Sequence, residues 1–299
     1  MKEKEQKALE AHILQNHSPR ALYGYMRVIR QYINYQGDEM AKRANYMQIT
    51  DYIGMLRGQG MHPKTLRNHL YALKMYYQWL ADSGQRDDHP CRDLYLKDKI
   101  NKAIPVETLF TKQELESILN SYTGKLPLTR NRDKIILSLL DHQAITVFEI
   151  IHLKTTDIDL VKGTINVNGS VKTKPRVLPL KPEQIMLLND YLEHARPLFV
   201  MHNKKPKQHD KEALILSRRG NRMAPLTISG IFSQPLSNGQ KITAQKVRQS
   251  AIAHLVKTGN DLRVVQAFTG HKRVGSVEEY RQTGLEELKT AINRFHPLQ

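Results

Sequence analysis

Apolar residues in the first third of the chain recur at the spacing of α-helices. An N-cap serine and a first-turn proline at Ser18-Pro19 open one such pattern, which continues to about residue 33. Further patterns cover residues 49–56 and 63–84, each ending at glycine, and a shorter one lies near 8–14. These four segments predict a small helical bundle.

The helical periodicity stops near residue 82. The stretch that follows contains two prolines and a charged run, which is typical of a linker. A new unit begins at Thr111, which has the spacing of a capping box with Glu114. The expected organisation is an N-terminal helical domain over residues 1–98, a linker over 99–108 and a C-terminal domain over 109–299.

The C-terminal domain combines helical and strand patterns. Alternation with period two over residues 164–168 and 176–180 predicts two paired strands, joined by a basic turn at 172–174. The polar stretch 202–211 is interpreted as a mobile loop. Helices are expected over 132–140, 145–153, from Pro182 to about 192, and over 244–257, 262–268, 276–280 and 285–295. The predicted fold class is therefore mainly α with a small antiparallel sheet (α+β).

Charge adds a function class to this picture. The 299 residues carry a formal net charge of +17, and a compact fold with that excess presents a positive surface to a polyanion. Basic residues occur along the whole chain and are not concentrated on one amphipathic segment, which favours nucleic acid over an acidic membrane. Duplex DNA is the expected partner.

Several classes are excluded or disfavoured. No run approaches about 18 apolar residues, so no membrane span is expected. The charged N-terminus lacks the apolar segment of a secretory signal. A single cysteine, Cys91, cannot form an intrachain disulfide, which fits a reducing cytoplasm. The expected location is the cytoplasm, in association with the nucleoid.

Basic residues recur on the polar faces of the predicted N-terminal helices. A solvated helix surface would also be basic in places, but few acids lie between these residues, which favours a phosphate-binding face. The candidates are Arg20, Arg27, Arg30, Lys64, Arg67 and Lys74, with Lys174 in the C-terminal domain.

Four C-terminal features form a candidate catalytic set. Lys172 lies in the strand–strand turn, and Arg248 lies on a helix with an apolar face. Gly270-His271 ends the next helix, and Tyr280 follows nine residues later. Each of these residue types alone is more often structural or solvated, so the order and spacing carry the interpretation.

These motifs resemble the tyrosine recombinase, or phage integrase, family. Residues 245–255, the segment 259–266 and Gly270-His271 resemble that family's H-x-L-R-H and G-x-D-L-R-x-I-Q-x-x-L-G-H, with a tyrosine about nine residues on. Residues 132–159 resemble its earlier motif R-D…T-G-L-R-x-x-E-L…D-I-D. The resemblance covers nearly the whole chain, including the N-terminal bundle, which resembles the family's DNA-clamping domain.

The resemblance implies a reaction and a set of roles. Tyr280 would attack a DNA phosphodiester and form a 3′-phosphotyrosyl link without metal or cofactor. Arg248 would grip two phosphoryl oxygens, and Lys172 would donate a proton to the leaving 5′-oxygen. His271 would donate a hydrogen bond to the phosphate or help to move the tyrosine proton.

Two positions depart from the family's pattern. Thr146 stands where the motif has its first arginine, and Gln245 stands where H-x-x-R has histidine. A glutamine amide still donates to phosphate, but loss of a preorganised cationic donor costs about 3–4 kcal/mol, or about 10²–10³ in rate. Candidate replacements for that cation are Arg130, Lys174 and Arg281.

Two function classes follow. The first is a site-specific recombinase of integrase type, belonging to a mobile element, that cleaves and rejoins DNA with an atypical site. The alternative is a catalytically impaired protein of the same fold that acts as a sequence-specific architectural or regulatory DNA-binding factor. An unrelated basic helical regulator would show no strand pairing around Lys172 and no cleft shared by Arg248 and His271.

The sequence also suggests assembly. Residues 285–295 form a short amphipathic pattern after the candidate nucleophile. Such a helix packs either on its own domain or, as the resemblance implies, on a neighbouring subunit. A homodimer or tetramer on DNA is therefore expected.

Overall fold

The computed structural model describes residues 3–100, 104, 108–122, 126–232 and 241–281. The chain divides into two compact units, residues 1–101 and 102–299. Each unit has its own buried apolar cluster, and each is described by itself below.

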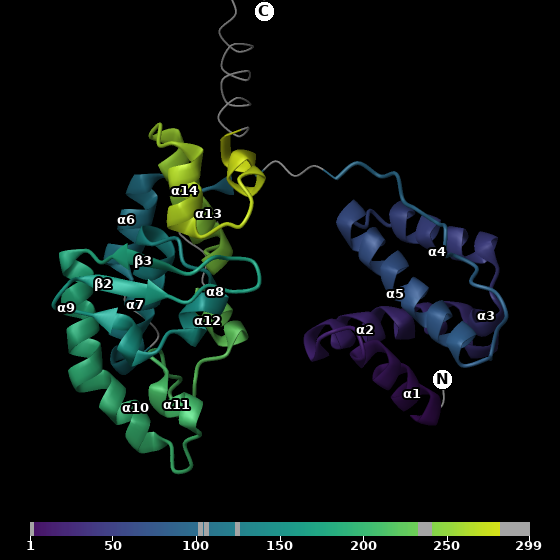
Figure 1. Cartoon of the computed structure of the whole chain (residues 1–299), viewed down its shortest axis with the longest axis horizontal. Helices are drawn as coiled ribbons and strands as arrows, with labels where there is room; N and C mark the ends of the chain where they lie inside the picture. The colour runs from purple at the N-terminus through teal and green to yellow at the C-terminus, as the bar shows by residue number, and fades with distance from the viewer. Residues whose placement is uncertain (1–2, 101–103, 105–107, 123–125, 233–240, 282–299) are drawn as a thin grey trace, which may run out of the picture. The chain divides into compact units, whose positions relative to one another are not determined.

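The first unit is a helical bundle (Figure 1). Helix α2 packs against α5, and α4 packs against α5 as well. The described helices of this unit are α1 (Glu3–Leu14), α2 (Pro19–Gln36), α3 (Asp38–Arg43), α4 (Tyr46–Gly58) and α5 (Pro63–Asp82). The bundle prediction is confirmed, with α3 as a helix that the sequence pattern did not indicate.

Local chemistry fixes where these helices begin. The Ser18 side chain accepts from the backbone N–H of Ala21 ahead of Pro19, and Asn45 and Gln48 form a capping box at the start of α4. The apolar faces bury tyrosines at the centre of the bundle, where the Tyr32 and Tyr77 hydroxyls lie 2.7 Å apart. The Tyr77 hydroxyl also donates to the Ala41 carbonyl, so these buried polar groups are paired.

The second unit is mainly helical around a small sheet. In Figure 1, α13 and α14 lie at one end of this unit and α10 and α11 at the other, with the sheet between them. Its described helices are α6 (Lys112–Ser121), α7 (Pro127–His142), α8 (Val147–His152), α9 (Pro182–Asp190), α10 (Arg196–His202), α11 (Gln208–Glu212), α12 (Pro225–Ile231), α13 (Ala244–Lys257) and α14 (Leu262–Thr269). A 3-10 turn covers Thr155–Asp157, a π-helical turn covers Tyr191–Ala195, and residues 275–281 are helical.

The sheet is antiparallel and has the order β1-β2-β3. Strand β2 (Thr164–Val167) pairs with β3 (Arg176–Pro179) in the register Val167 opposite Arg176. The predicted strand pair and the predicted α+β class are confirmed. The two-residue β1 (Ile158–Asp159) is an addition, because a segment this short gives no alternating pattern to detect.

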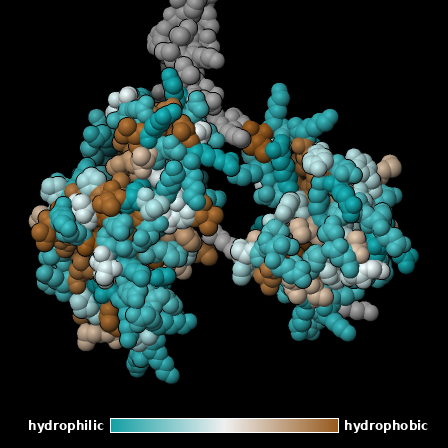
Figure 2. Space-filling view, viewed as in Figure 1, coloured by the Kyte–Doolittle hydropathy of each residue, from teal (hydrophilic) through white to brown (hydrophobic). Residues whose placement is uncertain are grey.

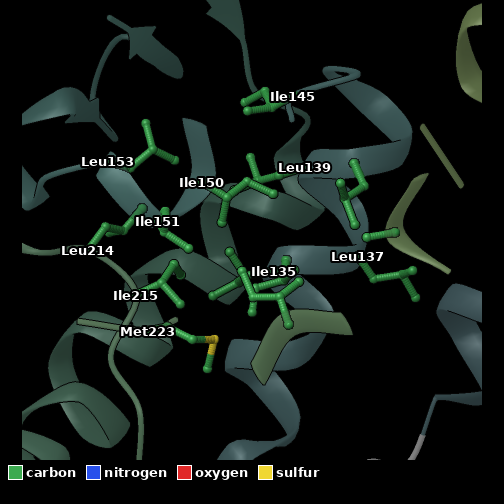
Figure 3. Close-up of a cluster of buried hydrophobic side chains, with 14 of the residues drawn as sticks. Ile135, Leu137, Leu139, Ile145, Ile150, Ile151, Leu153, Leu214, Ile215 and Met223 are labelled. Atoms are coloured by element: carbon green, nitrogen blue, oxygen red, sulfur yellow. The ribbon is translucent and has the colours of Figure 1, made fainter. Parts of the chain in front are cut away.

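The core of the second unit lies between α7, α8 and neighbouring segments. Figure 3 shows Leu139 of α7 and Ile150 of α8 within this cluster, with Leu214 and Ile215 beside them. Each fully buried side chain of this size contributes about 1.5–3 kcal/mol relative to exposure. The packing fixes the start of α8, where Thr146 lies.

Part of the expected mobile loop 202–211 is helical. Its residues 208–211 belong to α11, because the carboxylate of Asp210 is buried and accepts from the backbone N–H groups of Lys207 and Arg222. The expected helix over 285–295 lies outside the described residues. Figure 2 shows hydrophilic residues over much of the visible face of each unit, as the charge of the chain leads one to expect.

Candidate active site

The predicted catalytic residues line one hollow of about 790 Å³ in the second unit, here called the Tyr280 hollow. Loop residues before α8, the β2–β3 connection, α13 and the segment after α14 all contribute to it. Its lining consists of Ile104, Thr146, Val171, Lys172, Thr173, Gln245, Arg248, Gln249, His271, Lys272, Arg273, Ser276, Glu279 and Tyr280. Residues more than a hundred positions apart are thus brought together around the candidate nucleophile.

Thr146 forms an uncharged wall of the hollow. It is the N-cap of α8, and its hydroxyl accepts from the backbone N–H of Glu149 while lying 2.8 Å from the Glu149 carboxylate. The same carboxylate accepts from the Thr146 backbone N–H at 2.8 Å. This capping box holds the Thr146 side chain at the start of helix α8. A threonine side chain is also uncharged, so this position offers no cation to a substrate.

Glu149 is the centre of a buried polar network. Its carboxylate, whose side chain is 1% exposed, accepts from the Thr173 hydroxyl and from Arg176 Nη1, both at 2.7 Å. Burial raises the pKa of Glu149, but hydrogen bonding to Arg176 and the charge of that guanidinium outweigh burial and hold its pKa below the usual value. The Arg176 guanidinium is therefore neutralised inside the fold and does not line the hollow.

The Arg176 guanidinium also explains Gly270. This residue ends α14 in the left-handed region, at φ 76°. A Cβ there would collide with Arg176 Nη1 and Cζ. Glycine is required both for the backbone conformation and for the close approach of α14 to β3. The turn then delivers His271 to the hollow.

The β2–β3 connection is attached to this turn. The Lys174 backbone N–H donates to the Gly270 carbonyl at 2.7 Å, and Thr173 forms an isolated antiparallel bridge with His271. Lys172, one residue earlier, is exposed at the rim of the hollow. These contacts hold Lys172, the predicted proton donor, close to the turn that carries His271.

Arg248 projects from α13 into the hollow with one edge anchored. Its Nε donates to the Ala144 carbonyl at 2.7 Å, and Nη2 lies 3.4 Å from His271 Nε2. These bonds use two of the five guanidinium hydrogens, so three remain for a ligand. Ala144 itself has φ 48°, a left-handed conformation that costs a non-glycine residue about 1–2 kcal/mol.

The hydrogen bonds of His271 assign its tautomer. The Thr269 hydroxyl donates to the Val265 carbonyl at 2.7 Å and lies 2.6 Å from His271 Nδ1. Because that hydroxyl has one hydrogen, Nδ1 is the donor and Thr269 the acceptor. Nε2 then carries the lone pair, in agreement with the Arg248 N–H that faces it.

Electrostatics reinforce the neutral state of His271. Burial lowers the pKa of His271 to about 4, and the positive charges of Arg248 and Arg176 contribute to this lowering. At neutral pH the ring is therefore an uncharged acceptor at Nε2. Of the two roles expected for His271, a ring without a proton on Nε2 is compatible with accepting the tyrosine proton but not with donating to a phosphate through Nε2.

Tyr280 lies in the helical segment 275–281 and is 7% exposed. It packs in a small apolar cluster with Ala144, Ile252, Val265 and Val277. Burial raises the pKa of Tyr280, and the positive charge of Arg248 opposes that rise in part. A protonated phenol in the same hollow as a neutral imidazole and a cation is suited to deprotonation during attack.

Several lining residues were not predicted. Gln245 was expected and lies exposed at the hollow, but Gln249, Lys272 and Arg273 were not named. Lys272 and Arg273 follow His271 directly, so proximity to a candidate catalytic residue was the available signal. The candidate replacements Arg130, Lys174 and Arg281 are not among the described lining residues.

The predicted phosphate-binding residues of the first unit lie on two adjacent helices. Arg27 and Arg30 are exposed on α2, and Lys64 and Arg67 are exposed on α5. Lys74 of α5 is partly buried, and Arg20 lies in α2. Since α2 and α5 pack together, these residues belong to a pair of neighbouring helices.

Segment 92–98 contacts two of these residues. Arg67 Nη2 donates to the Asp98 carbonyl and Lys74 Nζ to the Arg92 carbonyl, each at 2.7 Å. Lys74 Nζ also lies 4.3 Å from the centroid of the Tyr95 ring. Both side chains are therefore held in place before any ligand binds.

Within the described part of the chain, no group of three or more His, Cys, Asp or Glu side chains is placed to hold a metal ion. In the same residues, no helix is long and apolar enough to cross a membrane.

Known proteins resemble the chain over nearly its full length. It is 27% identical over 293 residues to tyrosine recombinase XerC of Pelotomaculum thermopropionicum, covering 94% of both chains. It is also 27% identical over 284 residues to tyrosine recombinase XerA of Thermococcus kodakarensis, covering 93% of this chain and 90% of the relative.

Solved structures share the fold. The XerH site-specific recombinase bound to its palindromic difH substrate matches with a TM-score of 0.69 and 19% identity, over 93% of this chain and 80% of that one. The Tn1549 transposon integrase in complex with circular intermediate DNA matches with a TM-score of 0.67 and 17% identity, over 95% and 98%.

Two family models match the chain in order. The phage integrase N-terminal SAM-like domain matches residues 10–84, and the phage integrase family model matches residues 108–286. The second match contains Lys172, Arg248, His271 and Tyr280. The chain belongs to the phage integrase family of tyrosine recombinases, as the spacing of these residues predicted.

Proposed function

We propose that this protein is a site-specific DNA recombinase that cleaves and rejoins strands through a 3′-phosphotyrosyl intermediate. The observation that carries the proposal is the convergence of Tyr280, Arg248, His271 and Lys172 on one hollow. Recombinase relatives over almost the full length support it. The substrate is duplex DNA, for which the charge of +17 supplies attraction.

The proposed reaction begins with the Tyr280 phenol. Its oxygen attacks the scissile phosphorus while its proton passes to His271 Nε2, whose single lone pair is released when the Arg248 N–H that faces it turns to the phosphate. The bond from phosphorus to the 5′-oxygen breaks, and Lys172 Nζ protonates that leaving oxygen. Rejoining is the reverse transfer to a new 5′-hydroxyl, so the phosphodiester bond energy is conserved.

Arg248 stabilises the developing negative charge. Its Nε is anchored on the Ala144 carbonyl, so the remaining N–H groups are preorganised toward the hollow. A preorganised donor costs no reorganisation during the reaction, which is the basis of oxyanion stabilisation. Gln245 adds an uncharged amide donor at the exposed side.

The second candidate function is DNA binding without strand cleavage. The uncharged Thr146 wall is the observation that favours it, because one cationic donor predicted by the family motif is absent there. Architectural or regulatory binding would retain the basic helices α2 and α5. The two functions differ in whether a covalent adduct forms.

The decisive experiment tests for that adduct. Wild type and Tyr280→Phe are incubated with labelled DNA fragments from around the protein's own gene and resolved on denaturing gels. The recombinase gives an adduct that Tyr280→Phe lacks. Tyr122→Phe, at a tyrosine of the same unit outside the hollow, should behave as wild type.

Binding without cleavage would contradict the recombinase proposal. If native gels show both proteins bound to the same fragment and neither forms an adduct, the architectural function is the better one. Thr146→Arg would then test whether the missing cation alone prevents cleavage.

We further propose that the protein acts in the cytoplasm on the nucleoid as a homodimer or tetramer on DNA. Its net charge and relatives support this setting, and residues 285–295 are the proposed contact between subunits. Deletion from Leu285 onward should weaken cooperative binding to paired sites more than binding to a single site. Equal loss of both in gel-shift titrations would contradict it.

A further inference from the structure

The charge distribution around the Tyr280 hollow is uneven. On the α8 side, Thr146 is uncharged and Arg176 is neutralised by Glu149. The two residues that follow His271 are Lys272 and Arg273, and both line the hollow. Two of the four lysines and arginines among the described lining residues therefore lie on the segment that carries His271 and leads to Tyr280.

Lys272 and Arg273 are available to a ligand. Both are exposed, and neither side chain has a hydrogen bond or ion pair within the described residues. Arg176 and Arg132, by contrast, pair with Glu149 and Asp133 inside the fold. A basic side chain without an internal partner retains its full charge for an external anion.

The lining has a clear excess of positive charge. Among the described residues that line it, Glu279 is the acid that opposes Lys172, Arg248, Lys272 and Arg273. Attack on a phosphodiester adds negative charge at phosphorus, and the two cations expected from the motifs are Arg248 and Lys172. Lys172 is assigned to the leaving oxygen. Without further cations, Arg248 alone would therefore balance the negative charge on the phosphoryl oxygens.

We propose that Lys272 and Arg273 supply the cationic contact to the scissile phosphate that the Thr146 wall lacks. The proposal rests on the proposed recombinase function and adds two residues to its site. An arginine fork can hold two phosphoryl oxygens, and a lysine adds a point charge beside it. Both approach from the His271 segment, whereas the motif arginine would approach from the start of α8.

The first test measures the rate of covalent adduct formation at saturating DNA. Replacing both residues with glutamine should slow the rate about 10²–10³-fold, the loss typical of one preorganised donor. The charge-retaining swap Lys272→Arg with Arg273→Lys should stay within about tenfold of wild type. The matched control is Arg218→Gln with Arg219→Gln, an adjacent exposed pair outside the hollow that removes the same charge.

The second test alters the substrate and leaves the fold untouched. A methylphosphonate at the cleavage site mapped with wild type removes one negative charge from the reacting phosphate. If Lys272 and Arg273 balance that charge, the rate of adduct formation by the double glutamine variant on this DNA should recover to within about tenfold of the wild-type rate. Adding Thr146→Arg to the double variant supplies a cation from the α8 side, so cleavage of normal DNA should also recover to within about tenfold of wild type.

The outcomes separate the two proposals. No adduct from wild type on any fragment it binds would overturn the recombinase function and this inference with it. An adduct from wild type, together with equal rates for the double glutamine variant and the Arg218/Arg219 control, would overturn the inference alone. An equal fold-loss on normal and methylphosphonate DNA would also overturn it, because the pair would then contact DNA away from the reacting phosphate.

Discussion

Arg176 and Arg248 are two arginines of the second unit with opposite surroundings. Arg176, on β3, faces the Glu149 carboxylate at 2.7 Å, and its side chain is 6% exposed. Arg248, on α13, faces the Ala144 carbonyl and the neutral His271 ring. The first guanidinium is neutralised by a carboxylate, and the second is held by groups that carry no charge.

The difference separates a structural cation from a functional one. A carboxylate partner cancels the field that a guanidinium projects, whereas a carbonyl orients it without cancelling its charge. Burial lowers the pKa of Arg248, yet an arginine stays protonated in proteins. An uncompensated buried cation at a cleft is suited to an anionic ligand, here a phosphate.

The largest effect should come from breaking the structural pair. Arg176→Met leaves Glu149 buried without its cation, which typically costs about 3–5 kcal/mol. The free energy of unfolding from urea titrations monitored by circular dichroism measures this loss. Adding Glu149→Gln should recover part of it, because the amide needs no counter-ion. A loss below about 1 kcal/mol for Arg176→Met would mean that the pair contributes little.

Arg248 should show the reverse behaviour. Arg248→Gln should slow adduct formation about 10²–10³-fold at saturating DNA. The unfolding free energy should change by less than about 1 kcal/mol, since removal of an uncompensated buried charge offsets the lost bond to Ala144. If the unfolding free energy of Arg248→Gln fell as far as that of Arg176→Met, Arg248 would be a structural residue.

The contrast between these arginines also marks the limit of sequence reasoning. The sequence predicted Arg248 from its motif and its place on a helix with Val247 and Ile252, and the structure places it in the hollow. Arg176 looked like one residue of an alternating strand. Its role depends on Glu149, 27 positions away, and that pairing arises only when β3 packs beside α8.

Local signals were reliable where the chemistry is local. Caps at Ser18 and Thr111 mark the starts of helices that the structure confirms. The short β1 and α11 were missed because tertiary contacts stabilise them, in the case of α11 through Asp210. Lys272 and Arg273 follow His271 in the sequence, but only the fold shows that these two neighbours line the hollow.

Protonation of His271 gives the next largest effect. Its pKa of about 4 in the fold lies below the ordinary value near 6.5. Between these values the unfolded chain binds the proton more readily than the folded chain, so stability falls as the pH falls from 6.5 toward 4. The groups that face the ring are Arg248 from α13, Arg176 from β3 and Glu149 from α8.

His271→Gln removes that contribution. Wild type should lose about 2–3 kcal/mol more unfolding free energy than His271→Gln between pH 7 and pH 4. Other histidines whose pKa is lowered by burial, such as His69 and His142, titrate in both proteins and cancel in the difference. Parallel stability profiles for the two proteins would show that His271 has an ordinary pKa and is partly charged near neutrality.

The smallest effect concerns the group that anchors Arg248. Ala144 has φ 48°, which costs about 1–2 kcal/mol for a residue with a Cβ. Ala144→Gly removes this strain but adds the greater chain entropy of glycine, about 0.5–1 kcal/mol, and deletes a fully buried methyl group worth about 0.8 kcal/mol. These contributions nearly cancel, so the free energy of unfolding should change by less than about 1 kcal/mol. The carbonyl that accepts from Arg248 Nε belongs to the backbone and stays in place, so adduct formation should change less than about twofold. If the rate instead falls tenfold or more while the free energy of unfolding stays within about 1 kcal/mol, the strained alanine itself holds Arg248 in position. Anchoring of this cation then depends on side-chain packing at residue 144 as well as on the backbone hydrogen bond.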